Sequence, residues 1–227
     1  MKRLVIKVGT AVLTQDGQLA IERMENLVDL IAKLKNEKNL EVILVSSGAV
    51  GAGFTTLKLD KKIISNKQAL AAIGQPLLLK HYKKRFKEHN INCAQMLFIA
   101  DDFDSRKRTK NAQDVMEILL ENNILPIINE NDVIANYELL FGDNDQLAAH
   151  VAFHFKADML AILSDIDGYY NKNPREFSDA VLQKEIFEIN PDELEMKHTA
   201  NSEFATGGIV TKLKAADFLM KNNIPMY

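Results

Sequence analysis

The feature that most constrains the fold of this chain is a regular alternation of short apolar runs with segments of helical periodicity. The apolar runs, each typical of a buried strand, cover residues 4–8, 42–45, 93–98, 125–128 and 159–163. The helical patterns cover residues 21–34, 67–87, 115–120, 143–155 and 206–221. This alternation predicts an α/β fold with a mostly parallel central sheet and helices on both of its faces.

Other segments are less regular. Pro76 lies inside a helical pattern, where we expect it to kink or split the helix because proline removes a backbone hydrogen bond. Residues 133–141 are compatible with a hairpin and residues 181–189 with an extended segment. Residues 224–227 look like the start of a further strand.

The composition narrows the class of protein. The 227 residues include 28 basic and 31 acidic side chains, and this net charge of −3 does not favour nucleic acid as a partner. No apolar run is long enough to span a membrane or to form a signal peptide. Cys93 is the only cysteine, so no internal disulfide can form, which is typical of the cytoplasm. We expect a single domain over residues 1–227.

The unusual polar motifs coincide with the ends of predicted strands. Four of the motifs come at or just after such a strand, at residues 7–10, 46–53, 129–132 and 164–165. Two further motifs begin helices, at residues 143–145 and 206–212. Ligands of parallel α/β sheets bind at the carboxyl ends of the strands. The motifs therefore predict a ligand site at that edge of the sheet.

Two glycine-rich segments could bind an anion. The three glycines of residues 46–53 suit either a tight turn between strand and helix or a loop whose N–H groups contact phosphate. This segment matches neither the Walker A pattern nor the G-x-G-x-x-G pattern. Gly207 and Gly208 precede a helix whose N-terminus attracts anions, and Lys212 lies one turn further along. Phosphate binding is the favoured interpretation at this second segment.

Lys7 and two acidic motifs complete the set of candidates. Lys7 interrupts an apolar run, so it lies either on an edge strand in water or at a strand end facing a phosphate. Residues 129–132 and 142–145 together carry four acids and three amides. They could be two polar turns, or they could bind an ammonium group, hold a lysine, or coordinate Mg²⁺ through water.

Taken in order, these motifs resemble those of the amino-acid-kinase family over essentially the whole chain. The resemblance rests on residues 6–10, 46–50, 73–75, 126–132, 141–145, 163–170 and 206–212. Asn-Glu-Asn-Asp at 129–132 followed by Gly-Asp-Asn-Asp at 142–145 is most similar to the branch that phosphorylates the side-chain carboxylate of glutamate.

The resemblance implies an open αβα sandwich and assigns roles to individual residues. Lys7 and Lys212 would contact the transferring phosphoryl group, and Asp145 would orient both lysines. Gly48 and Gly51 would belong to a phosphate-binding loop. The residues that would bind L-glutamate are Ser47, Asp132 and Asn144. The residues that would contact ATP are Lys7, Ser164, Asp165, Thr206, Gly207, Gly208, Ile209, Val210, Thr211 and Lys212.

The resemblance also implies a cytoplasmic transferase that uses ATP, with Mg²⁺ carried by the nucleotide and not bound directly by the protein. Its product, L-glutamyl 5-phosphate, would be the first intermediate of proline biosynthesis, with proline as feedback inhibitor and a glutamyl-phosphate reductase as a further partner. The family implies a homo-oligomer. Many members carry a C-terminal PUA domain, which we do not expect in this chain. Because the family fold continues beyond a strand like 224–227, we also expect a missing tail.

Two alternatives stay open. Kinases of the same family act on N-acetylglutamate, aspartate, carbamate or UMP, but a free α-amino group needs an acidic partner, which Asp132 with Asn144 offers. A nucleotide-binding regulator without catalysis should lack Lys7 or Lys212, and both are present. Catalysis on glutamate needs no general base, because a carboxylate of pKa about 4.3 is already an anionic nucleophile at neutral pH.

Overall fold

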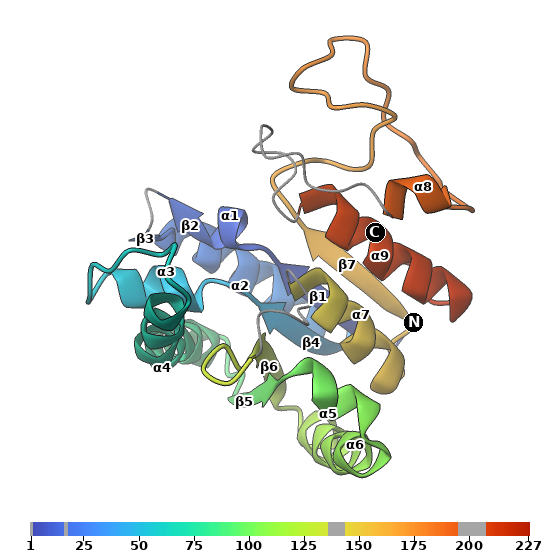
Figure 1. Cartoon of the computed structure of the whole chain (residues 1–227). Helices are drawn as coiled ribbons and strands as arrows, with labels where there is room; N and C mark the ends of the chain where they lie inside the picture. The colour runs from blue at the N-terminus through green and yellow to red at the C-terminus, as the bar shows by residue number, and fades with distance from the viewer. Residues whose placement is uncertain (1, 16–17, 136–143, 195–207) are drawn as a thin grey trace.

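A twisted parallel sheet forms the centre of the molecule (Figure 1). The computed structural model describes residues 2–15, 18–135, 144–194 and 208–227. Within these residues, the strands of the central sheet are β1 (Arg3–Val8), β4 (Glu41–Ser46), β5 (Cys93–Phe98), β6 (Leu125–Glu130) and β7 (Met159–Leu163), in the spatial order β5-β6-β4-β1-β7. The short strands β2 (Thr14–Gln15) and β3 (Gln18–Leu19) form a separate antiparallel pair.

Helices cover both faces of this sheet (Figure 1). They are α1 (Thr10–Leu13), α2 (Ile21–Asn36), α3 (Ala49–Phe54), α4 (Ile64–Glu88), α5 (Ala100–Asp104), α6 (Arg106–Glu121), α7 (Asn144–His154), α8 (Pro191–Leu194) and α9 (Gly208–Lys221). The α/β class and the mostly parallel sheet are thus confirmed. No described helix is both long and apolar enough to cross a membrane.

The two-residue period of the strands divides the core into two halves. Leu4, Ile6 and Val8 of β1 pack on one face with residues of α2 and α4. Val5 of the same strand packs on the other face with residues of α6, α7 and α9. Lys7 has the same parity as Val5, so its side chain belongs to the face that α7 covers.

Strand β1 lies in the interior of the sheet. Lys7 is paired with Val45 of β4 on one side and with Ile162 of β7 on the other. The alternative that placed Lys7 on an edge strand in water is therefore wrong. The prediction of a further strand at the C-terminus is confirmed, because Leu160 of β7 forms a parallel bridge with Met226.

Helix α4 continues through Pro76 without a break, so the expectation of a split helix is wrong. Gly74 of this helix lies directly against α3. A Cβ added to Gly74 would lie 1.7 Å from the carbonyl oxygen of Ala49, and one added to Gly53 would lie 1.9 Å from that of Leu70. Glycine at both positions therefore lets the two backbones approach closely.

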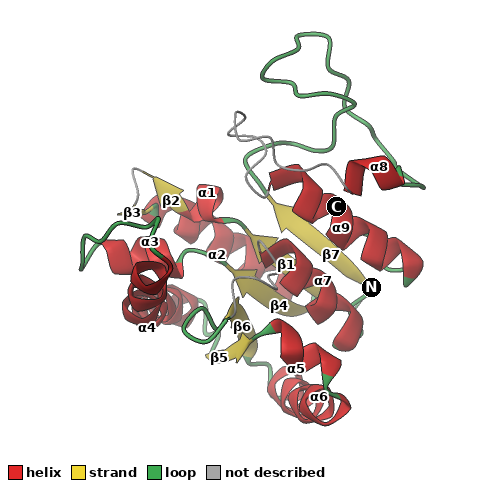
Figure 2. Cartoon of the chain, viewed as in Figure 1, coloured by secondary structure: helices red, strands yellow, loops and turns green. Residues whose placement is uncertain are grey.

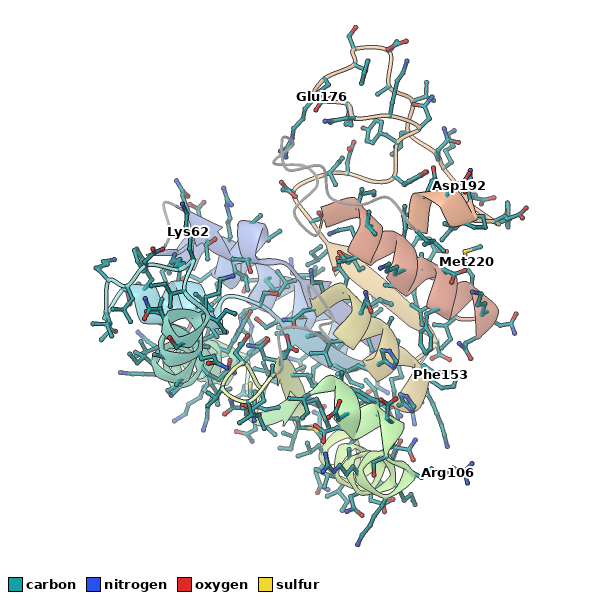
Figure 3. All side chains as sticks on the ribbon, viewed as in Figure 1. Lys62, Arg106, Phe153, Glu176, Asp192 and Met220 are labelled. Atoms are coloured by element: carbon teal, nitrogen blue, oxygen red, sulfur yellow. The ribbon has the colours of Figure 1, made fainter. Side chains whose placement is uncertain are left out.

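A long connection without helix or strand joins β7 to α8 (Figure 2). It folds back on itself through one antiparallel bridge between Tyr170 and Leu182, and of these two residues Leu182 lies in the segment 181–189 that was predicted to be extended. Glu176 lies at the far end of this connection, well away from the sheet (Figure 3). The predicted hairpin at 133–141 lies mostly outside the described residues; residues 132–134 form a turn.

Candidate active site

One carboxylate joins two lysines at the carboxyl end of the sheet. Asp145 Oδ1 lies 2.6 Å from Lys7 Nζ, and Asp145 Oδ2 lies 3.0 Å from Lys212 Nζ. Thr211 Oγ1 donates a third contact to Asp145 Oδ2 at 3.0 Å. The side chains of Lys7 and Asp145 are 1% and 0% exposed, whereas that of Lys212 is 20% exposed. The predicted catalytic residues thus meet, with only Lys212 open to solvent.

The fold explains why these residues meet. Lys7 is the second-to-last residue of an internal strand and lies on the face that α7 covers. Asp145 lies in the first turn of α7, where the positive end of the helix dipole stabilises a carboxylate. Lys212 lies in the first turns of α9, a helix that packs along α7. Three elements therefore bring one acid and two cations together.

The charge state of Asp145 follows from its two partners. Burial alone would raise the pKa of its carboxyl. The ammonium groups of Lys7 and Lys212 outweigh burial and lower the pKa of Asp145 below its ordinary value. Asp145 is consequently ionised at neutral pH, and the cluster carries two positive charges and one negative charge.

Asn144 and Ser47 form a second, neutral group beside this cluster. Asn144 Nδ2 donates to Ser47 Oγ at 3.0 Å and to the backbone carbonyl of Ser46 at 3.2 Å. Asn144 Nδ2 also lies 2.8 Å from Asn129 Oδ1, and Asn129 Nδ2 donates to Gln75 Oε1 at 2.8 Å. Two of the predicted glutamate-binding residues are therefore in direct contact.

Asp132, the third predicted glutamate-binding residue, lies on the turn after β6. Burial raises the pKa of its carboxyl to about 6, while nearby Lys67 acts in the opposite direction. Burial and the charge of Asp132 together raise the pKa of Glu130 to about 7. Within the described part of the chain, Asp132 forms no ion pair, so its carboxylate could pair with a cation that arrives from solution.

Most of the predicted nucleotide-binding residues lie just after β7 or at the start of α9. Asp165, just after β7, accepts a hydrogen bond from Arg175 at 2.8 Å, and this partner lowers the pKa of Asp165. Ser164 donates to the same carboxylate at 3.3 Å. Gly208 begins α9, and its carbonyl accepts a bond from Lys212 Nζ at 3.1 Å. Ile209 and Val210 follow in the first turn, whereas Thr206 and Gly207 lie outside the described residues.

The glycines of residues 46–53 serve two different purposes. Gly48 has φ of 104°, a left-handed conformation that other residues rarely adopt, and it links β4 to α3. Gly51 lies inside α3, where an added Cβ would lie 3.0 Å from Thr14 Cγ2. The interpretation of this segment as a tight turn between strand and helix is therefore confirmed. The assignment of both glycines to a phosphate-binding loop stays a prediction.

The sequence motifs contained two residues whose role was not recognised. Gln75 and Asn129 are 9% and 3% exposed, and both lie behind Asn144. Only the contacts across the sheet reveal this, since 54 positions separate the two in the sequence. In the described ranges, no three His, Cys, Asp or Glu side chains gather in a way that could hold a metal ion.

Comparisons with known proteins agree with this arrangement. A model of the amino acid kinase family matches residues 2–227. A glutamate 5-kinase of Wolinella succinogenes is 56% identical over 231 residues, covering 100% of this chain and 88% of the relative. A glutamate 5-kinase of Leishmania donovani is 52% identical over 227 residues, covering 100% of this chain and 86% of the relative.

Solved structures share the fold at low sequence identity. A substrate complex of isopentenyl phosphate kinase superposes with a TM-score of 0.65 at 16% identity, covering 99% of this chain and 88% of that one. The UMP kinase of Ureaplasma parvum superposes with a TM-score of 0.63 at 18% identity, with the same coverage. With the family model and the close relatives, these findings show that the chain belongs to the amino acid kinase family.

Proposed function

We propose that this chain transfers the γ-phosphoryl group of ATP to the side-chain carboxylate of L-glutamate, giving L-glutamyl 5-phosphate. The reaction is that of the glutamate 5-kinases to which the chain is 44–56% identical over almost its whole length. In the proline pathway it is the first step, and the product would pass to a reductase.

The observation that carries the proposal is the pair of lysines held by Asp145. The acceptor carboxylate and the triphosphate are both anions, so their approach is the main barrier that the protein must lower. Two ammonium groups fixed by one carboxylate, at 2.6 and 3.0 Å, provide positive charge at the sheet edge where ligands of such folds bind. Mg²⁺ would arrive with the nucleotide and neutralise further phosphate charge.

The neighbouring groups suit glutamate at the acceptor end. Asn144, next to Asp145 in the chain, and Ser47, which Asn144 contacts, offer neutral hydrogen-bonding groups. Asp132 offers a carboxylate for the α-ammonium group. An N-acetylated acceptor has no ammonium group, so binding it would leave Asp132 without that partner.

The test is ADP release by the purified chain with ATP, Mg²⁺ and one acceptor at a time. L-glutamate should support turnover, and N-acetylglutamate, aspartate and UMP should be much poorer, by about tenfold or more in kcat/KM, because a buried charge would lose its partner. Equal turnover of N-acetylglutamate would overturn the assignment of Asp132. Preference for UMP would overturn the proposed acceptor altogether.

A further inference from the structure

A chain of buried side-chain amides runs behind the proposed glutamate site. It begins at Gln75 on α4, passes through Asn129 at the end of β6 and reaches Asn144 at the start of α7. Each of these three side chains is less than a tenth exposed. Alternation along β6 places Asn129 on the same face as Ile127, which is the face that α4 covers.

The hydrogen bonds in this chain have a fixed direction. Gln75 Oε1 accepts from Asn129 Nδ2, and Asn129 Oδ1 then accepts from Asn144 Nδ2. An amide carries its donor and its acceptor on opposite branches, so the orientation of one amide dictates that of the next. The backbone carbonyl of Ser46 can only accept, and at 3.2 Å it fixes the same orientation of Asn144 from the other end.

The consequence for Asn144 is chemical. Its amide nitrogen is turned toward Asn129, Ser46 and Ser47, so its carbonyl oxygen, an acceptor with two lone pairs, lies on the opposite branch of the amide. An acceptor at this point suits a ligand that brings N–H donors, such as an α-ammonium group. A reversed amide would present N–H groups and repel the same ligand.

Helix α4 supports both ends of this arrangement from one face. Gln75 and Tyr82 are two helical turns apart, and the Tyr82 hydroxyl lies 2.8 Å from Ser46 Oγ. Tyr82 is fully buried, and it anchors the residue whose carbonyl faces Asn144. The contact at Gly53 and Gly74 places α4 at close range to α3, next to Gln75.

We propose that Gln75 is a positioning residue that selects acceptors bearing an ammonium group. It acts through Asn129, whose carbonyl it turns toward Asn144, and not by touching the substrate. This inference rests on the proposed function, since it names what sets the selectivity of the same acceptor site.

The experiment compares L-glutamate with glutarate, which has both carboxylates and no amino group. In Gln75→Met, the side chain keeps its length and loses its acceptor. We expect KM for glutamate to rise about tenfold, KM for ATP to stay unchanged, and the preference for glutamate over glutarate in kcat/KM to fall about tenfold. Gln75→Glu keeps an acceptor oxygen and should restore most of the preference.

Gln113→Met is the matched control. Gln113 is likewise a glutamine held by a side-chain hydrogen bond, which its amide nitrogen donates to the backbone carbonyl of His154 at 2.8 Å, but it lies on α6. Its substitution should leave the glutamate preference unchanged. Should Gln75→Met fail to fold, Asn129→Leu and Asn129→Asp replace it. The leucine variant should lose the preference for glutamate over glutarate. The aspartate variant should keep it, because an ionised carboxylate can only accept hydrogen bonds.

The outcomes separate this inference from the proposed function. Glutamate turnover by the unchanged protein, together with an unaltered preference in Gln75→Met, would overturn the inference alone. A parallel rise of both KM values would also overturn it, because a displaced helix would then explain the effect. An unchanged protein that shows no glutamate-dependent ADP release would overturn the proposed function and this inference with it.

Discussion

Two neighbouring residues at the start of α7 lead into regions of opposite character. Asp145 leads into a charged cluster with Lys7 and Lys212, while Asn144 leads into a neutral network with Asn129 and Gln75. Both regions are buried, and within each region several hydrogen bonds or ion pairs join the side chains. They differ in whether their members carry charge.

The difference fits the roles that we propose for the two regions. A buried charge is costly unless it is paired, so fixed charges are favourable where the reaction itself moves charge, as at a transferring phosphoryl group. Recognition of an acceptor needs direction more than charge, and amides provide a donor and an acceptor in fixed positions. We therefore expect changes in the first region to alter kcat and changes in the second to alter KM for glutamate.

The largest expected effect belongs to the two lysines. Lys7→Ala or Lys212→Ala should lower kcat by roughly 10²–10³, because each removes a preorganised cation from the developing charge. Lys214→Ala is the control, since Lys214 is exposed two positions along the same helix. Steady-state kinetics with ATP and glutamate test this. A near-normal kcat in Lys7→Ala would contradict a catalytic role for the charged cluster.

A smaller effect is expected where α4 meets α3. Gly74→Ala places a Cβ 1.7 Å from the Ala49 carbonyl oxygen, so the two helices must separate. Overpacking of this kind typically costs about 1–3 kcal/mol of unfolding free energy. Because Gln75 adjoins Gly74, KM for glutamate should rise while KM for ATP does not.

Chemical denaturation and kinetics measure the two consequences of Gly74→Ala. Ala69→Ser adds an atom to an exposed position of the same helix and should change neither stability nor KM. Should KM for ATP rise as much as KM for glutamate, α4 would not be specific to the acceptor end.

A pH dependence of glutamate use is expected from Asp132. Its pKa is raised to about 6, so the carboxylate that would pair with the ammonium group becomes protonated as the pH falls through that value. The kcat/KM for glutamate should therefore decline below about pH 6, as the free protein takes up a proton. Asp132→Asn should show a low and flatter profile. A persistent inflection near pH 6 in Asp132→Asn would assign it to another group, with Glu130 the nearest candidate.

The smallest effect is expected at the far side of α7, where stacked rings surround two histidines. His150 stacks on Phe103 and Phe218 at 5.4 and 4.7 Å, and its ring lies 5.9 Å from that of His154. Burial lowers the pKa of both imidazoles, with His154 also lowering that of His150, while Asp104 acts in the opposite direction.

The sign of the resulting stability change follows from these shifts. The unfolded chain binds protons with the ordinary histidine pKa near 6.5, whereas the folded chain binds them only at lower pH. The contribution of the two neutral histidines to stability should therefore be fully present above about pH 6.5. The free energy of unfolding should fall as the pH drops below that value. His150→Phe should lessen this loss in thermal melts, and His89→Gln, on the surface beside Asp29, should not. An unchanged pH slope in His150→Phe would contradict this.

The sequence was sufficient to predict the layers and the ligand edge. Strand and helix periods are local signals, and parallel topology brings the motifs after the strands to one edge. The contact of Asp145 with Lys7 and Lys212 was expected only from the family resemblance. The environment of Lys7 could not be predicted, because an internal and an edge strand share one apolar pattern. Likewise, no local pattern shows that Gln75 and Asn129 contact each other, since that contact depends on how α4 packs across the sheet.

The division between Asn144 and Asp145 is tested most directly by changing each one and measuring both sets of kinetic constants side by side. Asn144→Ala should raise KM for glutamate about tenfold or more and keep kcat within about threefold, as expected for a group that contributes to ground-state binding. Asp145→Asn should lower kcat severely while calorimetry still detects ATP binding, because the lysines lose the charge that holds them. The same pattern of change in both variants, or loss of all nucleotide binding in Asp145→Asn, would contradict the account.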